Sequence, residues 1–189
     1  MRVVSGIAKG IPLKAPKGDL VRPTVDRLKE TLFNMIQHEV YDAVVLDLFA
    51  GSGGLGIEAL SRGASEAYFC EKNQAAFEIM KENLNKTKLM NHAKLYFGDF
   101  IVALPKMAIQ KVRFDLVFLD PPYEKAEFYQ KSIEFLVEKD MLSEDALIIA
   151  ETISGLDFSF LEKYDTIWIE KSKIFKTNQY IFMRYGNGA

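Results

Sequence analysis

Short apolar segments alternate with amphipathic stretches along most of the chain. The apolar segments predict strands over residues 43–49, 66–71, 93–99, 114–120, 146–152, 166–171 and 179–185. Between them, apolar residues at helical spacing predict helices over 55–62, 73–88 and 125–138, and a short helix interrupted by Pro105. This alternation is typical of an α/β fold with a parallel sheet covered on both faces. The short connection between the last two strands predicts that they are antiparallel.

The N-terminal segment has a different pattern. Residues 1–20 are punctuated by Gly and Pro and hold only short apolar pieces, which predicts a small arm or hairpin. Thr24 is a plausible N-cap for a helix whose apolar stripe is Val25, Leu28, Leu32, Met35 and Ile36. We therefore expect an arm over residues 1–21 and one α/β domain over residues 22–189.

Composition excludes several classes of protein. A chain of 189 residues with 49% hydrophobic residues can bury one sizeable core. Charges interrupt every hydrophobic stretch, so neither a membrane span nor a secretory signal is expected. A single cysteine, Cys70, cannot form an internal disulfide, which favours the cytoplasm. We expect Cys70 to belong to the core, and the two histidines, His38 and His92, lack metal-ligand spacing.

Charge is distributed unevenly. The net charge is −2, but residues 1–30 hold seven Lys/Arg against three acids, so this segment carries +4 and the remainder −6. A cationic arm on an acidic body indicates either an anionic partner at one end or a solvated tail. We expect deletion of residues 1–20 to abolish activity on such a partner and to leave cofactor binding intact.

A glycine-rich stretch follows the first predicted strand and opens a helix. Residues 47–56 read Asp-Leu-Phe-Ala-Gly-Ser-Gly-Gly-Leu-Gly, with the Gly-x-Gly-x-x-Gly spacing at 51, 53 and 56. Glycines allow a tight turn and a close approach of the backbone to a ligand. Glu71 lies 20 residues after Gly51 at the next strand end, where it would accept from ribose hydroxyls. Together these features predict a nucleotide site.

Four predicted strands end at or next to an acid, namely Asp47, Glu71, Asp99 and Asp120. Ligands of open parallel sheets bind at the carboxyl ends of the strands, so these acids should converge on one site. Asp47 beneath the glycine loop opposes a pyrophosphate but suits the ammonium and cationic sulfur of S-adenosylmethionine, whose carboxylate a helix N-terminus can hold. Asp99 could accept from an adenine amino group, with Phe100 beside the ring, or could cap the following helix.

The segment Asp120-Pro121-Pro122-Tyr123 follows an apolar strand directly. Two prolines remove two N–H donors, so the segment presents acceptors. The Asp120 carboxylate and the Pro121 carbonyl could both accept from one exocyclic amine, and Tyr123 could stack on its base. Such a base must leave its stack to reach the site. The alternative is a turn that ends a strand, with Tyr123 in the core.

On these residues the chain resembles the RsmD-type 16S ribosomal RNA guanine-N2 methyltransferases over nearly its whole length. The resemblance lies in the arm (Arg2 to Leu13), in the most distinctive segment (residues 22–34), in the loop at 47–64 and in residues 120–123. It implies a Rossmann-like class I methyltransferase fold with a mostly parallel seven-stranded sheet and one antiparallel strand. It also implies S-adenosylmethionine as methyl donor and one guanine of the small-subunit RNA as target.

The site residues follow from the motifs and the resemblance together. Catalysis is assigned to Asp120, Pro121, Pro122 and Tyr123. The cofactor is assigned to Asp47, Phe49, Ala50, Gly51, Ser52, Gly53, Glu71, Lys72, Asp99 and Phe100. Substrate RNA is assigned to Arg2, Lys9, Lys14, Lys17, Arg22, Thr24 and Arg27. No metal and no membrane are expected, the partner is ribosomal RNA within a small subunit or its precursor, and a monomer is expected. A DNA adenine-N6 methyltransferase and a non-catalytic RNA-binding assembly factor are the alternatives.

Overall fold

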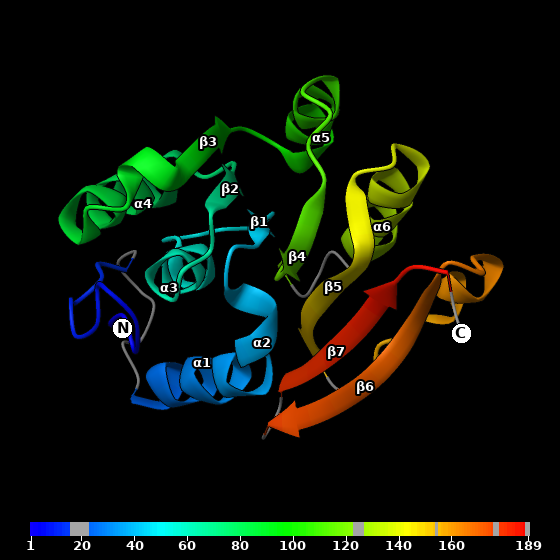
Figure 1. Ribbon diagram of the computed structural model, residues 1–189, viewed down its shortest axis with the longest axis horizontal. Coiled ribbons are helices and arrows are strands. Elements are labelled where there is room, and N and C mark those ends of the chain that lie inside the picture. Colours follow the sequence, from blue (N-terminus) through cyan, green and yellow to red (C-terminus); the bar gives the residue numbers. More distant parts are fainter. Residues whose placement is uncertain (16–22, 123–126, 154, 176–177, 188–189) are drawn as a thin grey trace.

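A computed structural model of the chain describes residues 1–15, 23–122, 127–153, 155–175 and 178–187, without the side chains of residues 23–25 and 175. Its centre is a seven-stranded sheet in the order β3-β2-β1-β4-β5-β7-β6 (Figure 1). The strands are β1 Val44–Asp47, β2 Glu66–Glu71, β3 Ala93–Phe97, β4 Phe114–Leu119, β5 Leu142–Ile153, β6 Ile167–Phe175 and β7 Asn178–Tyr185. Strand β7 runs opposite to the other six of these strands and pairs antiparallel with β5 and β6, which confirms the predicted sheet.

Helices cover both faces of the sheet (Figure 1). One face carries α1 Pro23–Met35, α2 Gln37–Val40, α3 Gly54–Ser61 and α4 Gln74–Thr87. The other carries α5 Phe100–Ile109, α6 Glu127–Glu138 and the 3-10 turn Ser159–Lys163, and a second such turn, Met90–His92, leads into β3. Each layer has its own core because each helix turns an apolar stripe toward the sheet. In α6, for example, the predicted inward residues Tyr129, Ile133 and Leu136 are buried.

The structure corrects two local predictions. Helix α5 runs unbroken through Pro105, because buried residues on both sides of the proline, among them Phe100 and Met107, hold it against the core. Thr24 is not an N-cap, since α1 already begins at Pro23. Proline suits the first helical position, where its missing N–H costs no hydrogen bond.

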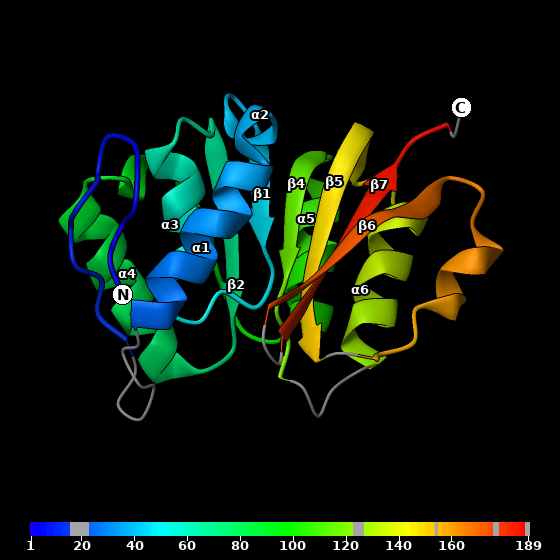
Figure 2. The same ribbon diagram turned by 90° about the horizontal axis from the view of Figure 1, so that it is seen from below.

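The first residues pack against the body of the protein. Backbone hydrogen bonds from Val3 to Ile11 and from Leu13 to Met1 close a short loop, with a bridge between Arg2 and Pro12. Val3, Leu13 and Ala8 are buried in the same core as α3 and α4, and the loop lies beside these helices (Figure 2). Residues 1–15 are therefore packed rather than extended into solvent, and we refer to them as the N-terminal arm. The predicted division at residue 21 falls outside the described residues.

The connectivity places the site. The strand order reverses between β1 and β4, since β2 and β3 lie on one side of β1 while β4 and β5 lie on the other. Loops that leave the carboxyl ends of such strands diverge and leave a crevice between them. None of the helices in the described ranges is both long and apolar enough to cross a membrane.

Candidate active site

The glycine loop links β1 to α3 and has the backbone geometry that its sequence predicts. Gly53 has φ +81°, in the left-handed region that favours glycine, and directly precedes α3. Gly56 allows the helix to approach the sheet, because a Cβ there would lie 2.3 Å from the Phe69 ring. Asp47 supports the loop from below: its carboxylate accepts from the Gly56 N–H at 2.9 Å. The loop is thus held against β1 while its outer surface faces a cavity.

Three of the four predicted carboxylates surround one cavity of about 460 Å³, here called the Glu71 cavity. Glu71, Asp99 and Asp120 line it together with Phe49, Gly51, Lys72 and Phe100, all of which were assigned from the sequence, and with Phe128. Its volume lies within the range of small-molecule sites. The structure thus brings three of the four predicted acids to one cavity, whereas Asp47 is buried beneath the glycine loop and does not line it.

Two of these carboxylates already accept hydrogen bonds from the backbone. Glu71 accepts from the Gly51 N–H at 2.8 Å and from the Asn73 N–H at 2.6 Å, so it joins the glycine loop to the end of β2. Asp99 accepts from the Ile101 N–H at 3.1 Å and is the N-cap of α5. A carboxylate has about four lone-pair positions, so both groups keep acceptor capacity for a ligand.

A second cavity of about 290 Å³ also borders Asp120 and is here called the Glu151 cavity. The glycine loop, through Ala50 and Ser52, and the acids Asp47 and Glu151 form part of its wall. Asp120 lines both cavities, as do Phe49 and Gly51. Asp120 therefore stands at the junction of the two cavities.

The acceptor segment at the end of β4 borders these cavities. Pro121 and Pro122 line the Glu71 cavity beside Asp120, whereas Tyr123 lies outside the described residues. Among the residues that the structure describes, no donor is hydrogen-bonded to the Asp120 carboxylate. The segment thus presents acceptor atoms to the site without a protein partner from the described chain.

Burial perturbs two acids of the site. Asp120 is exposed toward the cavities, yet protein crowds its carboxylate, and this loss of hydration raises its pKa well above the ordinary value. The neighbouring charges of Glu151 and Asp47 raise it further. Burial raises the pKa of Asp47 to about 7, partly offset by the Gly56 N–H. Because the carboxylates of Asp120, Glu151 and Asp47 lie close to one another, the site favours a ligand that brings positive charge or N–H donors.

Cys70 borders the Glu71 cavity but is not activated. It is buried, and burial together with the neighbouring acids raises the pKa of its thiol to about 12. A catalytic cysteine needs the opposite shift, toward the thiolate. The expectation that Cys70 belongs to the core is confirmed.

Comparison with known proteins identifies the family. A family model described as "Conserved hypothetical protein 95" matches residues 1–184. Ribosomal RNA small subunit methyltransferase D of Escherichia coli K12 is 36% identical over 152 residues, which cover 80% of this chain and 74% of that protein. YlbH of Bacillus subtilis is 44% identical over 80% of this chain and 82% of its own length. The solved structure of yhhF from Escherichia coli has a TM-score of 0.84 and 30% identity, covering 100% of this chain and 99% of that one.

The chain belongs to the family of the ribosomal RNA small subunit methyltransferases D. Its Rossmann-like fold and its methyltransferase class follow from this membership.

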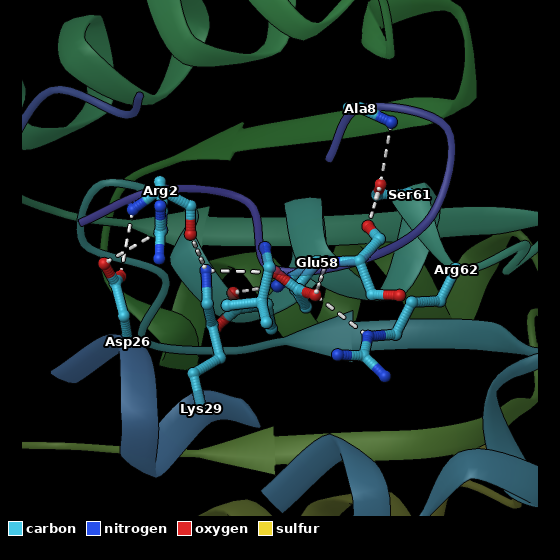
Figure 3. Close-up of polar contacts among 11 residues, drawn as sticks. Arg2, Ala8, Asp26, Lys29, Glu58, Ser61 and Arg62 are labelled. Carbon is cyan, nitrogen blue, oxygen red and sulfur yellow. Dashed lines mark hydrogen bonds and ion pairs between the residues drawn. The ribbon is translucent and has the colours of Figure 1, made fainter. Parts of the chain in front are cut away.

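In this family member, the distinctive segment at residues 22–34 holds the N-terminal arm (Figure 3). Asp26 of α1 accepts from the Arg2 N–H at 2.9 Å, and Lys29 donates to the Arg2 carbonyl at 2.7 Å. Lys29 also pairs with the fully buried Glu58 of α3 at 3.1 Å. Burial lowers the pKa of Lys29, an effect that the Glu58 carboxylate opposes. The motif therefore has a structural role that sequence reasoning alone did not assign.

The residues predicted to contact RNA are not all equivalent. Lys9 and Arg27 are exposed, and so is Arg2, although it lies 3.8 Å from Asp26. Lys14 is exposed and pairs with Glu82. Lys17 and Arg22 lie outside the described residues, as does the side chain of Thr24. Their contact with RNA stays a prediction.

Sequence reasoning missed several residues of the site. Glu151, Asn178 and Tyr180 line the Glu151 cavity, and Phe128 lines the other. The sequence did contain a signal for Glu151, because this acid lies near the end of the predicted strand at 146–152. Asn178 and Tyr180 come from β7, and their approach depends on the antiparallel pairing of β7 with β5.

Proposed function

We propose that this protein transfers a methyl group from S-adenosylmethionine to the N2 amine of one guanine in small-subunit ribosomal RNA. The observation that carries the proposal is the position of Asp120 between two cavities. The Glu71 cavity has the acceptors that a nucleoside requires. The Glu151 cavity would take the methionine end of the cofactor beside Asp47 and has acceptors for a base at Asp120 and Glu151. Ribosomal RNA as substrate is supported by the relatives named for that activity.

S-adenosylmethionine is the methyl donor of this family, and the residues present fit it. Glu71 would accept from its ribose hydroxyls and Asp99 from its adenine amine, with the Phe100 ring beside the base. Asp47 would face the ammonium, and the uncapped N-terminus of α3 the carboxylate. When bound, the cofactor supplies an electrophilic methyl group on a cationic sulfur.

The acceptor segment explains how a weak nucleophile could react. The lone pair of the guanine N2 amine is delocalised into the ring. Hydrogen bonds from its two N–H groups to the Asp120 carboxylate and the Pro121 carbonyl would draw the nitrogen out of conjugation and orient its lone pair. The methylated amine is acidic, so its extra proton can leave to Asp120 or to water. The raised pKa of Asp120 makes this carboxylate a competent acceptor for that proton.

The N-terminal arm is proposed to contact the phosphates of the RNA through Arg2, Lys9 and Lys14, aided by Arg27 of α1. Phosphate contacts position a protein on nucleic acid without reading its sequence. The arm lies on the same side as the Glu151 cavity, because Met1 forms part of that cavity wall. Under this proposal the protein works in the cytoplasm on a small subunit or its precursor.

Single-turnover methyl transfer to small ribosomal subunits that lack the modification tests this proposal. We expect N2-methylguanine as the product, identified by mass spectrometry of the RNA. Asp120→Ala should lower the rate by about 100-fold or more, because one charge-assisted acceptor is lost from the site. Its affinity for S-adenosylhomocysteine should stay near that of the wild type, since Asp120 is assigned to the amine.

The exposed acid Asp165 provides a matched control, and Asp165→Ala should retain the wild-type rate. A near-normal rate in Asp120→Ala would remove this residue from the chemistry. Methylation of adenine in DNA in place of ribosomal RNA would support the rival enzyme. Cofactor binding with no methyl transfer to any RNA or DNA would favour an assembly factor.

A further inference from the structure

Glu151 stands beside Asp120 on the neighbouring strand. Strands β4 and β5 are parallel, and Leu119 pairs with Ala150, so the next residues on the two strands are Asp120 and Glu151. Neighbouring strands lie about 4.8 Å apart, which is within reach of two adjacent groups on one base. Both carboxylates border the Glu151 cavity, and their charges interact.

The Glu151 carboxylate is held in one orientation by β7. Asn178 donates to Oε1 at 2.6 Å and the Tyr180 hydroxyl donates to Oε2 at 2.9 Å. The backbone is held as well, since the Tyr129 hydroxyl donates to the Glu151 carbonyl at 2.5 Å. Among the described residues, each carboxylate oxygen thus has one donor, and about two lone-pair positions remain for a ligand. A carboxylate whose orientation is fixed by such hydrogen bonds is suited to recognition of a ligand.

We propose that Glu151 selects guanine by accepting a hydrogen bond from its N1–H while Asp120 accepts from the adjacent N2 amine. This inference rests on the proposed function and adds a residue that reads the base. On the Watson–Crick edge, guanine places an N–H donor next to the amine. Adenine places a lone pair at the ring nitrogen next to its amine. A fixed carboxylate at that position attracts guanine and repels adenine, because it can only accept.

The purine 2-aminopurine, which also lacks the 6-oxygen of guanine, tests this contact when wild type and Glu151 variants are compared. It carries the same 2-amine as guanine, but its N1 has a lone pair in place of the N–H. Small subunits can be reconstituted with ligated RNA that carries either guanine or 2-aminopurine at the nucleotide identified by mass spectrometry. The ratio of the two single-turnover rates then measures discrimination at N1 and C6 together, independent of the general activity of the preparation. The part of the ratio that a Glu151 variant removes is assigned to N1.

The wild type should methylate guanine about 10- to 100-fold faster than 2-aminopurine, since a carboxylate facing a lone pair forfeits one charge-assisted hydrogen bond. Glu151→Gln should bring this ratio within about threefold of unity, because an amide can either accept from N1–H or donate to N1. Glu144, an exposed residue on the same strand, provides a matched control. Glu144→Gln should keep the wild-type ratio.

Three results would overturn the role of Glu151. A wild-type ratio near one, or a high ratio that Glu151→Gln leaves unchanged, would show that Glu151 does not read N1. An equal loss of rate on both bases in Glu151→Gln would show a purely structural role. A loss of S-adenosylhomocysteine affinity in that variant, matching its loss of rate, would place Glu151 at the cofactor ammonium. In each case guanine methylation by the wild type would persist, whereas its absence would refute the proposed function itself.

Discussion

The buried carboxylate of Glu58 is the attachment point of the N-terminal arm, and its removal is the sharpest test of how the arm is held. Its Oε1 accepts from the Ser5 N–H and from Arg62 Nε, both at 2.9 Å. Its Oε2 accepts from the Val4 N–H at 2.8 Å and from Lys29 at 3.1 Å. The side chain is 0% exposed, so water can replace none of these four donors.

Glu58→Gln keeps the shape of the side chain but replaces one oxygen with an NH₂ group. In either orientation of the amide, one cation and one backbone N–H lose their acceptor. Breaking one partner of a buried ion pair costs about 3–5 kcal/mol, because the remaining charge stays out of water. For a chain of this size each kcal/mol lowers the melting temperature by about 2–4 °C, so we expect a decrease of about 6–20 °C.

The pH dependence of this loss of stability in Glu58→Gln identifies its cause. Without Glu58 the pKa of Lys29 in the folded protein should fall further below its unfolded value. The folded state then prefers the neutral amine, so the variant should regain stability relative to the wild type as the pH rises toward the unfolded pKa of lysine.

Thermal unfolding at several pH values measures both effects, with Glu78→Gln as the control. Glu78 forms an exposed ion pair with Lys81, and its loss should cost less than about 1 kcal/mol. A melting temperature of Glu58→Gln within about 2 °C of the wild type would refute the role of the buried pair.

Three further predictions concern the cofactor site. Glu71→Ala should weaken S-adenosylhomocysteine binding by about 1.5–3 kcal/mol in calorimetry, because the ribose and the glycine loop both lose an acceptor; unchanged affinity would contradict the assignment. Affinity for the same ligand should fall as the pH drops through about 7, where Asp47 takes up a proton and loses its attraction for the ammonium; Asp47→Asn should abolish this dependence, and a slope that persists in the variant would assign it elsewhere. Deletion of residues 1–15 should weaken both RNA and cofactor binding, because Asn83 bonds both the Lys14 backbone and the Ser52 carbonyl of the glycine loop; normal cofactor affinity in the truncated form would show the arm to be separable.

The last expectation reverses the one drawn from the sequence, in which the arm could be removed without effect on the cofactor. Charge and the Gly and Pro content predicted an arm over residues 1–21, and that boundary stays a prediction. They carried no information about the buried contacts of Val3 and Leu13 or about the hydrogen bonds to Asn83. Contacts between residues so distant in sequence leave no local pattern, because the residues next to each partner along the chain can be of any type.

The sequence by itself determined the sheet, the glycine loop and the four strand-end acids, because each depends on a local pattern or on the connection between consecutive elements. Apolar strands that alternate with amphipathic helices can bury their surfaces in few ways, and parallel strands then bring their carboxyl ends together. The position of the first helix terminus and the continuity of α5 were missed, because packing overrides local preference at such points.

Only the tertiary structure decided what each acid contacts. Asp47 and Glu71 bond the backbone of the glycine loop, Asp99 caps a helix, and Asp120 faces two cavities without a protein donor from the described residues. Glu151 became part of the site through its neighbours on β4 and β7, which lie far from it along the chain. The sequence does not distinguish one acid at a strand end from another. The role of each acid depends on which hydrogen-bond donors the fold brings to its carboxylate and on which carboxylate oxygens remain available to a ligand.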